Sequence, residues 1–212
     1  PWIKFWADYS EKTTQVVHRY FKEQKKLVEP KLFHALPNDF LKQSALFLGN
    51  SMPIRNAESF FCPEEPIGPI FANRGLSGID GNIATAIGIA AGIEKPVVAI
   101  LGDLSFLHDI NSLAQLMHSP FPVSFLVINN NGGSIFASLP LNKSKSSILP
   151  ILQNSHNLAL HQIAPLFNLS YVNPQSLSEF ADSLKKIEST SCLIEVQTES
   201  EDYLKIHEEI VT

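Results

Sequence analysis

Two polar positions in the middle of the chain, Asp103 and Asn130, have the residue types and spacing of a magnesium-diphosphate site. Each follows a short apolar run: Asp103 comes after residues 97–101, and residues 129–133 (Asn-Asn-Asn-Gly-Gly) come after residues 123–128. One carboxylate with amide and carbonyl oxygens suits a hard cation such as Mg²⁺, which completes its shell with water and phosphate oxygens. Nearby glycines allow close backbone approach, and helical N–H groups favour an anion. Taken alone, Asp103 has a simpler alternative role as a helix N-cap.

The charges around this region support a metal-bridged diphosphate. Residues 96–142 contain no Lys or Arg, so metal and helix dipoles would have to neutralise the diphosphate. A Walker-type loop is excluded here because it needs its lysine. The formal net charge of −5 also argues against a general nucleic-acid surface.

The elements that would position these residues form a βαβ series. Continuous apolar runs, each followed by turn residues and a helical pattern, are typical of strands covered on both faces. We therefore expect an α/β fold with a doubly wound, mostly parallel sheet and helices on both faces, and ligands at the carboxyl ends of the strands. The Ser-, Lys- and Asn-rich stretch 141–154 is expected to be a long loop, a lid or a partner contact. Strands are predicted at 45–48, 69–72, 97–101, 123–128, 169–172 and 192–197, and helices at 81–92, 106–117, 158–167, 176–187 and 200–210.

The bulk properties describe a globular chain. Of its 212 residues 44% are hydrophobic, and no apolar run approaches the ~20 residues that cross a bilayer, so a cytoplasmic location is the default expectation. Cys62 and Cys192 lack metal-ligand spacing and are expected to be two buried, reduced thiols.

The N-terminal region indicates a piece of a longer protein. Because the chain starts at Pro1, without an initiator Met, and runs straight into a helical pattern, we expect an excised fragment. Residues 1–40 are predicted to be a helical segment that links an upstream domain to a diphosphate-binding domain at 41–212. Within that segment we expect a helix capped by Ser10 and running to Leu27, and a second helix over 31–40.

Three extended motifs, in order along the chain, resemble one family. They are residues 73–81 (Asn-Arg-Gly-Leu-Ser-Gly-Ile-Asp-Gly), residues 102–105 (Gly-Asp-Leu-Ser) with Asp109 and Asn111, and residues 129–133 followed by Ile135-Phe136 and Leu139-Pro140. Together they resemble the C-terminal domain of the 2-succinyl-5-enolpyruvyl-6-hydroxy-3-cyclohexene-1-carboxylate synthase family, thiamine diphosphate enzymes of menaquinone biosynthesis. Leu104 departs from most thiamine diphosphate enzymes, which have Gly at that position.

The resemblance implies a set of cofactor contacts. Asp103 and Asn130 would supply side-chain oxygens to Mg²⁺ and Gly132 a backbone carbonyl. Leu104 and Ser105 would meet the diphosphate of thiamine diphosphate with backbone or hydroxyl groups. Ile79 would support the bent cofactor, although plain core packing is an alternative. Ser51 would line the pocket, although it could be an ordinary capping serine.

The resemblance also implies substrate contacts. Arg55 and Arg74 would hold substrate carboxylates, since a guanidinium pairs with a carboxylate in bidentate fashion; a surface role is the alternative for Arg55. Ile135, Phe136 and Leu139 would form an apolar wall for the ring of isochorismate, or simply belong to the core. The seven histidines share no spacing and are assigned no catalytic role.

The reaction implied is decarboxylation of 2-oxoglutarate and addition of the resulting acyl-anion equivalent to isochorismate. The cofactor carries this chemistry, and the glutamate that activates it is expected on a separate pyrimidine-binding domain, presented by a neighbouring subunit of a homodimer or homotetramer. We therefore expect no catalytic residue in this chain and no activity from it alone. The alternatives are another thiamine diphosphate enzyme, of acetolactate synthase or 2-oxoacid decarboxylase type, and a non-catalytic assembly domain.

Overall fold

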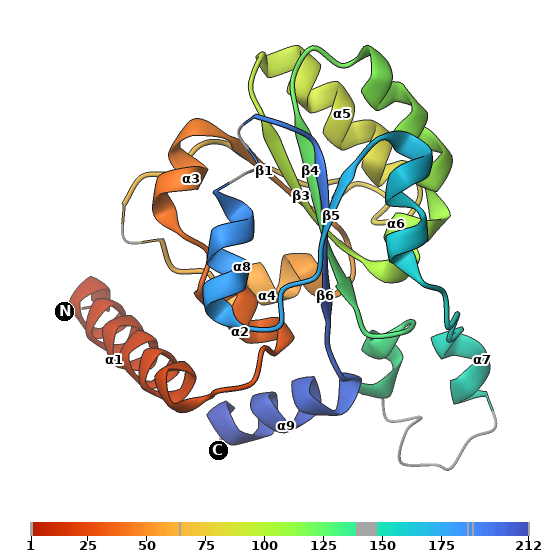
Figure 1. Ribbon diagram of the computed structural model, residues 1–212. Coiled ribbons are helices and arrows are strands. Elements are labelled where there is room, and N and C mark those ends of the chain that lie inside the picture. The colour runs from red at the N-terminus through yellow and green to blue at the C-terminus, as the bar shows by residue number, and fades with distance from the viewer. Residues whose placement is uncertain (1, 64, 139–147, 186, 188, 212) are drawn as a thin grey trace.

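A six-stranded sheet, parallel throughout and flanked by helices, organises the computed structural model (Figure 1). The structure describes residues 2–63, 65–138, 148–185, 187 and 189–211. The strand order is β2-β1-β3-β4-β6-β5, and every pairing is parallel, which confirms the predicted fold class. The strands are β1 (Ala45–Leu48), β2 (Ile70–Phe71), β3 (Val97–Gly102), β4 (Val123–Asn129), β5 (Ser170–Val172) and β6 (Cys192–Gln197).

The central strands are buried on both faces, as their continuous apolar runs predicted. Alternate residues of β3 enter different cores: Val98 and Ile100 join one cluster, whereas Val97, Ala99 and Leu101 join the other. All five are at most 1% exposed. A polar side chain on either face would therefore lie in a core, which explains why these strands do not alternate polar and apolar residues.

Two helical layers cover these faces. The first layer packs on the cluster that contains Val98 and consists of α1 (Trp2–Glu23), α2 (Glu29–His34), α3 (Asn38–Gln43), α4 (Met52–Phe60), α8 (Leu177–Leu184) and α9 (Ser200–Val211). The second packs on the cluster that contains Val97 and consists of α5 (Asn82–Ile93), α6 (Asp103–His108) and the 3₁₀ helices η1 (Ile110–His118), η4 (Leu160–Gln162) and η5 (Ala164–Phe167). Two short elements, η2 (Ser134–Ser138) and α7 (Leu149–Gln153), follow β4.

The N-terminal helices differ from the prediction. Helix α1 begins at Trp2, not at Ser10. Its first turns bring aromatic side chains four positions apart into contact, as in the pair Trp2 and Trp6, and such contacts stabilise a helix. The helix predicted over 31–40 is two helices, α2 and α3, separated at Pro37, which precedes α3 in an extended conformation. Proline removes a backbone donor and so interrupts a helix.

Four other expectations need correction. The helix predicted over 106–117 is α6, which begins at Asp103, followed by the 3₁₀ helix η1, and the one over 158–167 is two 3₁₀ helices. The loop predicted over 141–154 contains α7, while residues 139–147 lie outside the described part of the chain. Of the two cysteines, Cys192 is buried but Cys62 is exposed.

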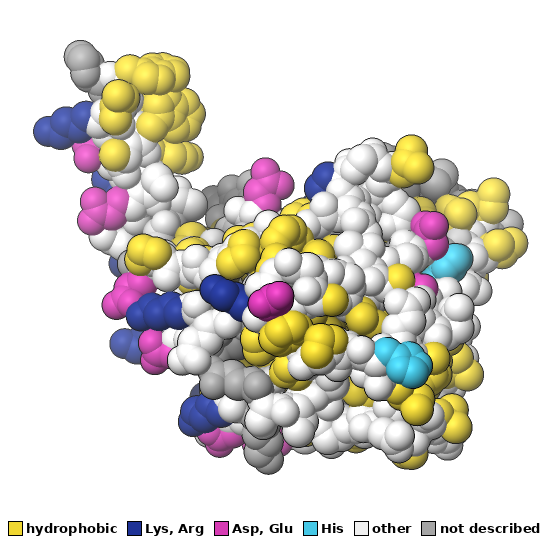
Figure 2. Space-filling view, turned by 90° about the horizontal axis from the view of Figure 1, so that it is seen from above, with side chains coloured by type: hydrophobic (Ala, Val, Ile, Leu, Met, Phe, Trp, Pro, Cys, Tyr) yellow, Lys and Arg dark blue, Asp and Glu magenta, His cyan; other side chains and the backbone are white. Residues whose placement is uncertain are grey.

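The outer end of α1 stands away from the sheet and gathers exposed apolar side chains (Figure 2). Trp2, Ile3, Phe5, Trp6 and Tyr9 are between 48% and 83% exposed. In contrast, the inner part of the helix packs Val17 and Phe21 against the core. Among the described helices, none combines the length and apolar character needed to cross a bilayer.

The start of α5 is capped from another element. Gly81 precedes the helix with φ 67° and offers no side chain, so the first N–H groups need a partner from elsewhere. Asp109 supplies it, because its Oδ2 accepts from the backbone N–H of Ile83 at 2.8 Å and of Ala84 at 3.0 Å. Its Oδ1 accepts from the Ser112 hydroxyl at 2.6 Å. Asp109 therefore has a structural role that ties η1 to α5.

The strand order reverses direction between β1 and β3. From β1 the chain moves outward to β2, then returns to β3 on the other side of β1 and continues to β4. Such a switch point leaves a crevice beyond the carboxyl ends of the two strands, because the following segments diverge. The segments after β1, β3 and β4 therefore meet at one edge of the sheet.

We predict that Phe106→Ala lowers the free energy of unfolding by about 3–5 kcal/mol, because it removes a large buried side chain and leaves a cavity. Phe106 is 0% exposed and holds α6 on the sheet, with its ring centroid 5.9 Å from that of Phe125. Urea denaturation measures the change. Phe5→Ala is the matched control, since Phe5 is 59% exposed; equal losses for both variants would contradict this packing.

Candidate functional site

A cavity of about 170 Å³ lies beyond the carboxyl ends of β1, β3 and β4. It is lined by Asp103 and Asn130, the two residues that the sequence predicts for a magnesium-diphosphate site. The lining residues are Glu29, Asn50, Ser51, Met52, Pro53, Ile79, Gly102, Asp103, Leu104, Ser105, Ile128, Asn130, Gly132, Gly133, Ser134, Ile135 and Phe136. Its volume is below the ~300–1,000 Å³ typical of ligand pockets, so it can enclose only part of a cofactor-sized molecule.

Asp103 begins α6 directly after β3 and is 2% exposed. Its Oδ1 accepts from the Leu104 N–H at 2.6 Å, and its Oδ2 accepts from the Gly132 N–H at 2.8 Å. Burial raises the pKa of this carboxyl, and the N–H groups of Gly132 and Leu104 and the ring of His156 only partly offset that rise. A charged Asp103 thus lacks full compensation from the protein.

Asn130 is held in one orientation after β4. Its Nδ2 donates to the Ser134 hydroxyl at 2.8 Å, while its Oδ1 is buried and has no hydrogen-bond partner among the described residues. A buried carbonyl oxygen without a donor costs free energy unless a ligand satisfies it. Among the described residues, therefore, none donates a hydrogen bond to this Asn130 oxygen.

The predicted metal ligands fit a hard cation. Asp103, Asn130 and Gly132 line one cavity and offer carboxylate, amide and backbone oxygens. The Gly132 carbonyl accepts from the Ser134 N–H at 3.0 Å, which leaves it a second acceptor position. No group of three His, Cys, Asp or Glu side chains with metal-binding geometry occurs in the described residues, so a soft-metal site is not indicated there.

Ile79 lies on the cavity wall and is fixed there through its carbonyl. The Ser105 hydroxyl donates to that carbonyl at 3.1 Å, and Asn82 Nδ2 lies 3.1 Å from the same oxygen and 2.7 Å from Ser105 Oγ. The Ser105 hydroxyl therefore donates its proton within the protein. A diphosphate would then be contacted by the backbone of Ser105, not by its hydroxyl. Leu104 also lines the cavity.

Ser51 has a strained backbone at the cavity. With φ 72° and ψ −123° it precedes α4, and its side chain makes no cap hydrogen bond. Ser51 thus occupies the N-cap position of α4, but its side chain does not cap the helix. A non-glycine residue in this conformation costs of order 1–3 kcal/mol, and such outliers concentrate at functional sites.

The two arginines hydrogen-bond to two consecutive residues, Asn50 and Ser51, at the edge of this site. Arg55 donates to the Ser51 carbonyl at 2.6 Å, and Arg74 donates to Asn50 Oδ1 at 2.9 Å. Asn50 is 1% exposed and also donates to the carbonyls of Asn73 and Gly78, so it joins the end of β1 to the loop after β2. Both arginines are exposed and neither lines the cavity itself.

The predicted apolar wall is present in part. Ile135 and Phe136, both in η2, line the cavity, and Phe136 packs close to Gly133. Leu139 lies outside the described residues.

Glu29, at the start of α2, also lines the cavity and was not anticipated from the sequence. It is 4% exposed, and its Oε1 accepts from Asn56 at 2.9 Å. Burial, followed by the charge of Asp103, raises the pKa of Glu29 to about 7. In the sequence, only the pair Glu29-Pro30 is informative here: it is typical of the start of a helix, but it does not show which way the Glu29 carboxyl points.

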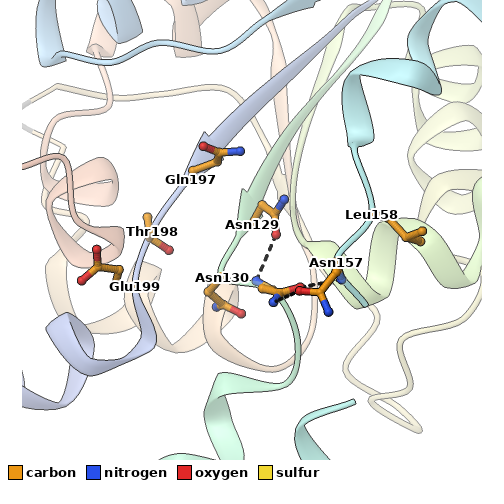
Figure 3. A pocket seen from close by; sticks show the side chains of 8 residues that line it. Asn129, Asn130, Asn157, Leu158, Gln197, Thr198 and Glu199 are labelled. Atoms are coloured by element: carbon orange, nitrogen blue, oxygen red, sulfur yellow. Dashed lines mark hydrogen bonds between the residues drawn. The ribbon is translucent and has the colours of Figure 1, made fainter. Parts of the chain in front are cut away.

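His156 was also missed, because no spacing related it to Asp103. Its Nε2 lies 3.2 Å from Asp103 Oδ2, and its side chain is 8% exposed. Beside it lies a more open groove of about 550 Å³, lined by Asn129, Asn130, Asn131, Asn157, Leu158, Gln197, Thr198 and Glu199 (Figure 3). The groove meets the cavity at Asn130, and the described residues that line it include no Lys or Arg.

Comparisons with known proteins identify the family of the chain. Residues 55–196 match the family model of the thiamine pyrophosphate enzyme, C-terminal TPP binding domain. A 2-succinyl-5-enolpyruvyl-6-hydroxy-3-cyclohexene-1-carboxylate synthase of Rubrobacter xylanophilus is 36% identical over 99% of the chain and 37% of its own length. Protein PHYLLO, chloroplastic, of Arabidopsis thaliana is 36% identical over 81% of the chain and 11% of its own length.

A solved structure shares the fold. It is described as a thiamin diphosphate-dependent enzyme of Mycobacterium smegmatis, with a TM-score of 0.65, 20% identity, and coverage of 84% of this chain and 33% of that one. The chain thus spans about a third of the length of the synthase and of this structure. The match over residues 55–196 shows that the chain belongs to the thiamine pyrophosphate enzyme family and carries its C-terminal thiamine pyrophosphate-binding domain.

Proposed function

We propose that the chain binds the diphosphate of thiamine diphosphate through Mg²⁺, as part of a carboligase that uses 2-oxoglutarate and isochorismate in menaquinone biosynthesis. The observation that carries this proposal is the buried, unpartnered Oδ1 of Asn130 in the same cavity as Asp103. A magnesium ion would be bound by this amide oxygen of Asn130 and by a carboxylate oxygen of Asp103. The synthase relative supports the choice of substrates through its name.

The residues of the chain would orient and shield the cofactor. Asp103, Asn130 and the Gly132 carbonyl would hold Mg²⁺, while Leu104 and the backbone of Ser105 would lie at the diphosphate. Ile79, fixed through Ser105 and Asn82, would support the cofactor's bend. When bound, thiamine diphosphate supplies the carbanion chemistry that decarboxylates a 2-oxoacid and joins the fragment to an acceptor.

The exposed arginines and the apolar wall would select the substrates. Arg55 and Arg74 would pair with carboxylates of 2-oxoglutarate and isochorismate. Arg55 hydrogen-bonds to Ser51 and Arg74 to Asn50, and both of these partners line the cavity. Ile135, Phe136 and Leu139 would contact the isochorismate ring. The activating glutamate would come from a pyrimidine-binding domain of a neighbouring subunit, which agrees with a cavity too small to enclose a whole cofactor.

We predict that the 212-residue chain binds thiamine diphosphate only with Mg²⁺, and that Asp103→Asn weakens this binding on the order of 100-fold, about 3 kcal/mol. Isothermal titration calorimetry with and without EDTA measures it. Asp8→Asn, on the exposed face of α1, is the control and should bind normally. Binding that survives EDTA, or that Asp103→Asn leaves unchanged, would rule out the metal-bridged site, whereas no binding in either condition would favour an assembly domain.

Glu29 should make the metal-free chain less stable as pH rises. Its pKa is raised from 4.5 to about 7 in the folded chain, so the folded state holds this proton more tightly than the unfolded state. Its contribution is complete below the unfolded value and is lost as pH rises through about 7, by roughly 3 kcal/mol in total.

We therefore predict that Glu29→Gln unfolds in urea with a smaller loss of stability between pH 5 and pH 8 than the unsubstituted chain, by roughly 3 kcal/mol. The amide keeps an oxygen that can accept from Asn56. Glu58→Gln, at an exposed position of α4, is the control and should retain the original pH dependence. If the free energy of unfolding fell equally with pH in Glu29→Gln and in the unsubstituted chain, Glu29 would not be the cause of the fall.

The chain alone should release no carbon dioxide from 2-oxoglutarate in the presence of thiamine diphosphate and Mg²⁺, because the proposed activating glutamate lies on another domain. A radiolabelled-substrate assay measures the release. Substantial release would overturn the proposed division of roles, and release from pyruvate but not 2-oxoglutarate would favour an acetolactate synthase or decarboxylase type.

A further inference from the structure

The segment 153–157 forms the second wall of the turn that contains the proposed metal ligands. The Gly133 N–H donates to the Gln153 carbonyl at 2.6 Å. Asn131 and Asn157 exchange two hydrogen bonds, from Asn131 Nδ2 to Asn157 Oδ1 at 2.9 Å and from the Asn157 N–H to Asn131 Oδ1 at 2.8 Å. The turn is therefore shaped by a segment some 25 residues further along the chain.

Gly132 is required by this close contact. Its φ is 137°, and a Cβ at this position would collide with the Gln153 carbonyl oxygen. A side chain would thus push segment 153–157 away from the turn, together with His156.

His156 lies in this segment, with its imidazole ring against Asp103. Its Nδ1 accepts from the Leu158 N–H at 3.0 Å, so in the neutral ring the proton is on Nε2. Nε2 lies 3.2 Å from Asp103 Oδ2 and therefore donates to it. The side chain of His156 is 8% exposed and that of Asp103 is 3% exposed, so water competes little for this hydrogen bond.

The carboxylate oxygens of Asp103 then differ in their remaining capacity. Oδ2 accepts from Gly132 and His156, whereas Oδ1 accepts only from Leu104 among the described residues. A carboxylate oxygen offers about two acceptor positions, so Oδ2 is filled and Oδ1 keeps one position open. The asymmetry depends on His156, because without it both oxygens would have one position free.

We propose that His156 is a positioning residue that fixes Asp103 so that Oδ1 is the oxygen left for a divalent cation, beside the unpartnered Oδ1 of Asn130. This inference rests on the magnesium-diphosphate site proposed above. Hydrogen-bond partners that orient a metal ligand typically contribute 10–100-fold to metal affinity. The role is one of orientation, and His156 itself does not bind the cation.

Two substitutions separate the two hydrogen bonds of the ring. The side-chain oxygen of His156→Asn can take the place of Nδ1 and accept from Leu158, but the side chain is too short to reach Asp103. His156→Gln places its amide nitrogen where Nε2 lies and can donate to Asp103, but it gives up the Nδ1 contact. A purely structural role in holding segment 153–157 would not favour glutamine over asparagine.

The experiment titrates Mn²⁺ into each chain with saturating thiamine diphosphate and follows free Mn²⁺ by electron paramagnetic resonance. We expect the Kd for Mn²⁺ to rise about 10–100-fold in His156→Asn and to return to within about threefold of the original in His156→Gln. His118→Asn, at an exposed position in η1, is the control. Thermal unfolding of the metal-free chains checks that each variant folds.

The outcomes distinguish this inference from the proposed function. Should the unsubstituted chain bind no Mn²⁺ with thiamine diphosphate, the proposed site fails and the role of His156 fails with it. Should that chain bind Mn²⁺ while His156→Asn binds equally well, or while both variants weaken equally, the site stands and the positioning role is overturned.

Discussion

The hydrogen bond from the Gly132 N–H to Asp103 Oδ2, 2.8 Å long, joins the ends of β3 and β4 across 29 residues of sequence. It requires two parallel strands that end at the same level, which the continuous pairing of Val97–Gly102 with Val123–Ile128 provides. The other site contacts depend on the same alignment. Asn130 can face the cavity because its neighbouring turn is held to Asp103, and Asn50 reaches the loop after β2 because β1 pairs with β3.

The site combines negative charge with little compensation from the chain. Asp103 and Glu29 line one cavity, and burial raises the pKa of both carboxyls. Residues 96–142 provide no Lys or Arg, and the exposed Arg55 and Arg74 lie outside the cavity. Holding two carboxyls in a buried place costs folding free energy that apolar residues would not cost. A divalent cation would offset this cost, which gives the unfavourable arrangement a functional reason.

The volume of the cavity limits what this chain can enclose by itself. A cavity of about 170 Å³ would hold only one end of a molecule of cofactor size, and the rest of that molecule would need another surface. The chain spans 37% of the length of the Rubrobacter xylanophilus synthase. The proposed division of labour, with orientation and charge on this domain and activation on another, agrees with a cavity that presents carboxylate and amide oxygens beside apolar side chains.

The sequence alone determined the sheet, because buried strands need unbroken apolar runs whatever surrounds them, and β1 and β6 begin and end where those runs do. It also determined where Asp103 and Asn130 lie. Each directly follows a strand, and neighbouring parallel strands end at the same edge of the sheet. Only the tertiary structure decided the positions of Glu29 and His156. They come from a helix 74 residues before Asp103 and a segment 53 residues after it, and no local pattern records such an approach. The end of α6 at His108 was likewise decided by the tertiary structure, because the next residue, Asp109, caps α5, whereas the break at Pro37 follows from the proline itself.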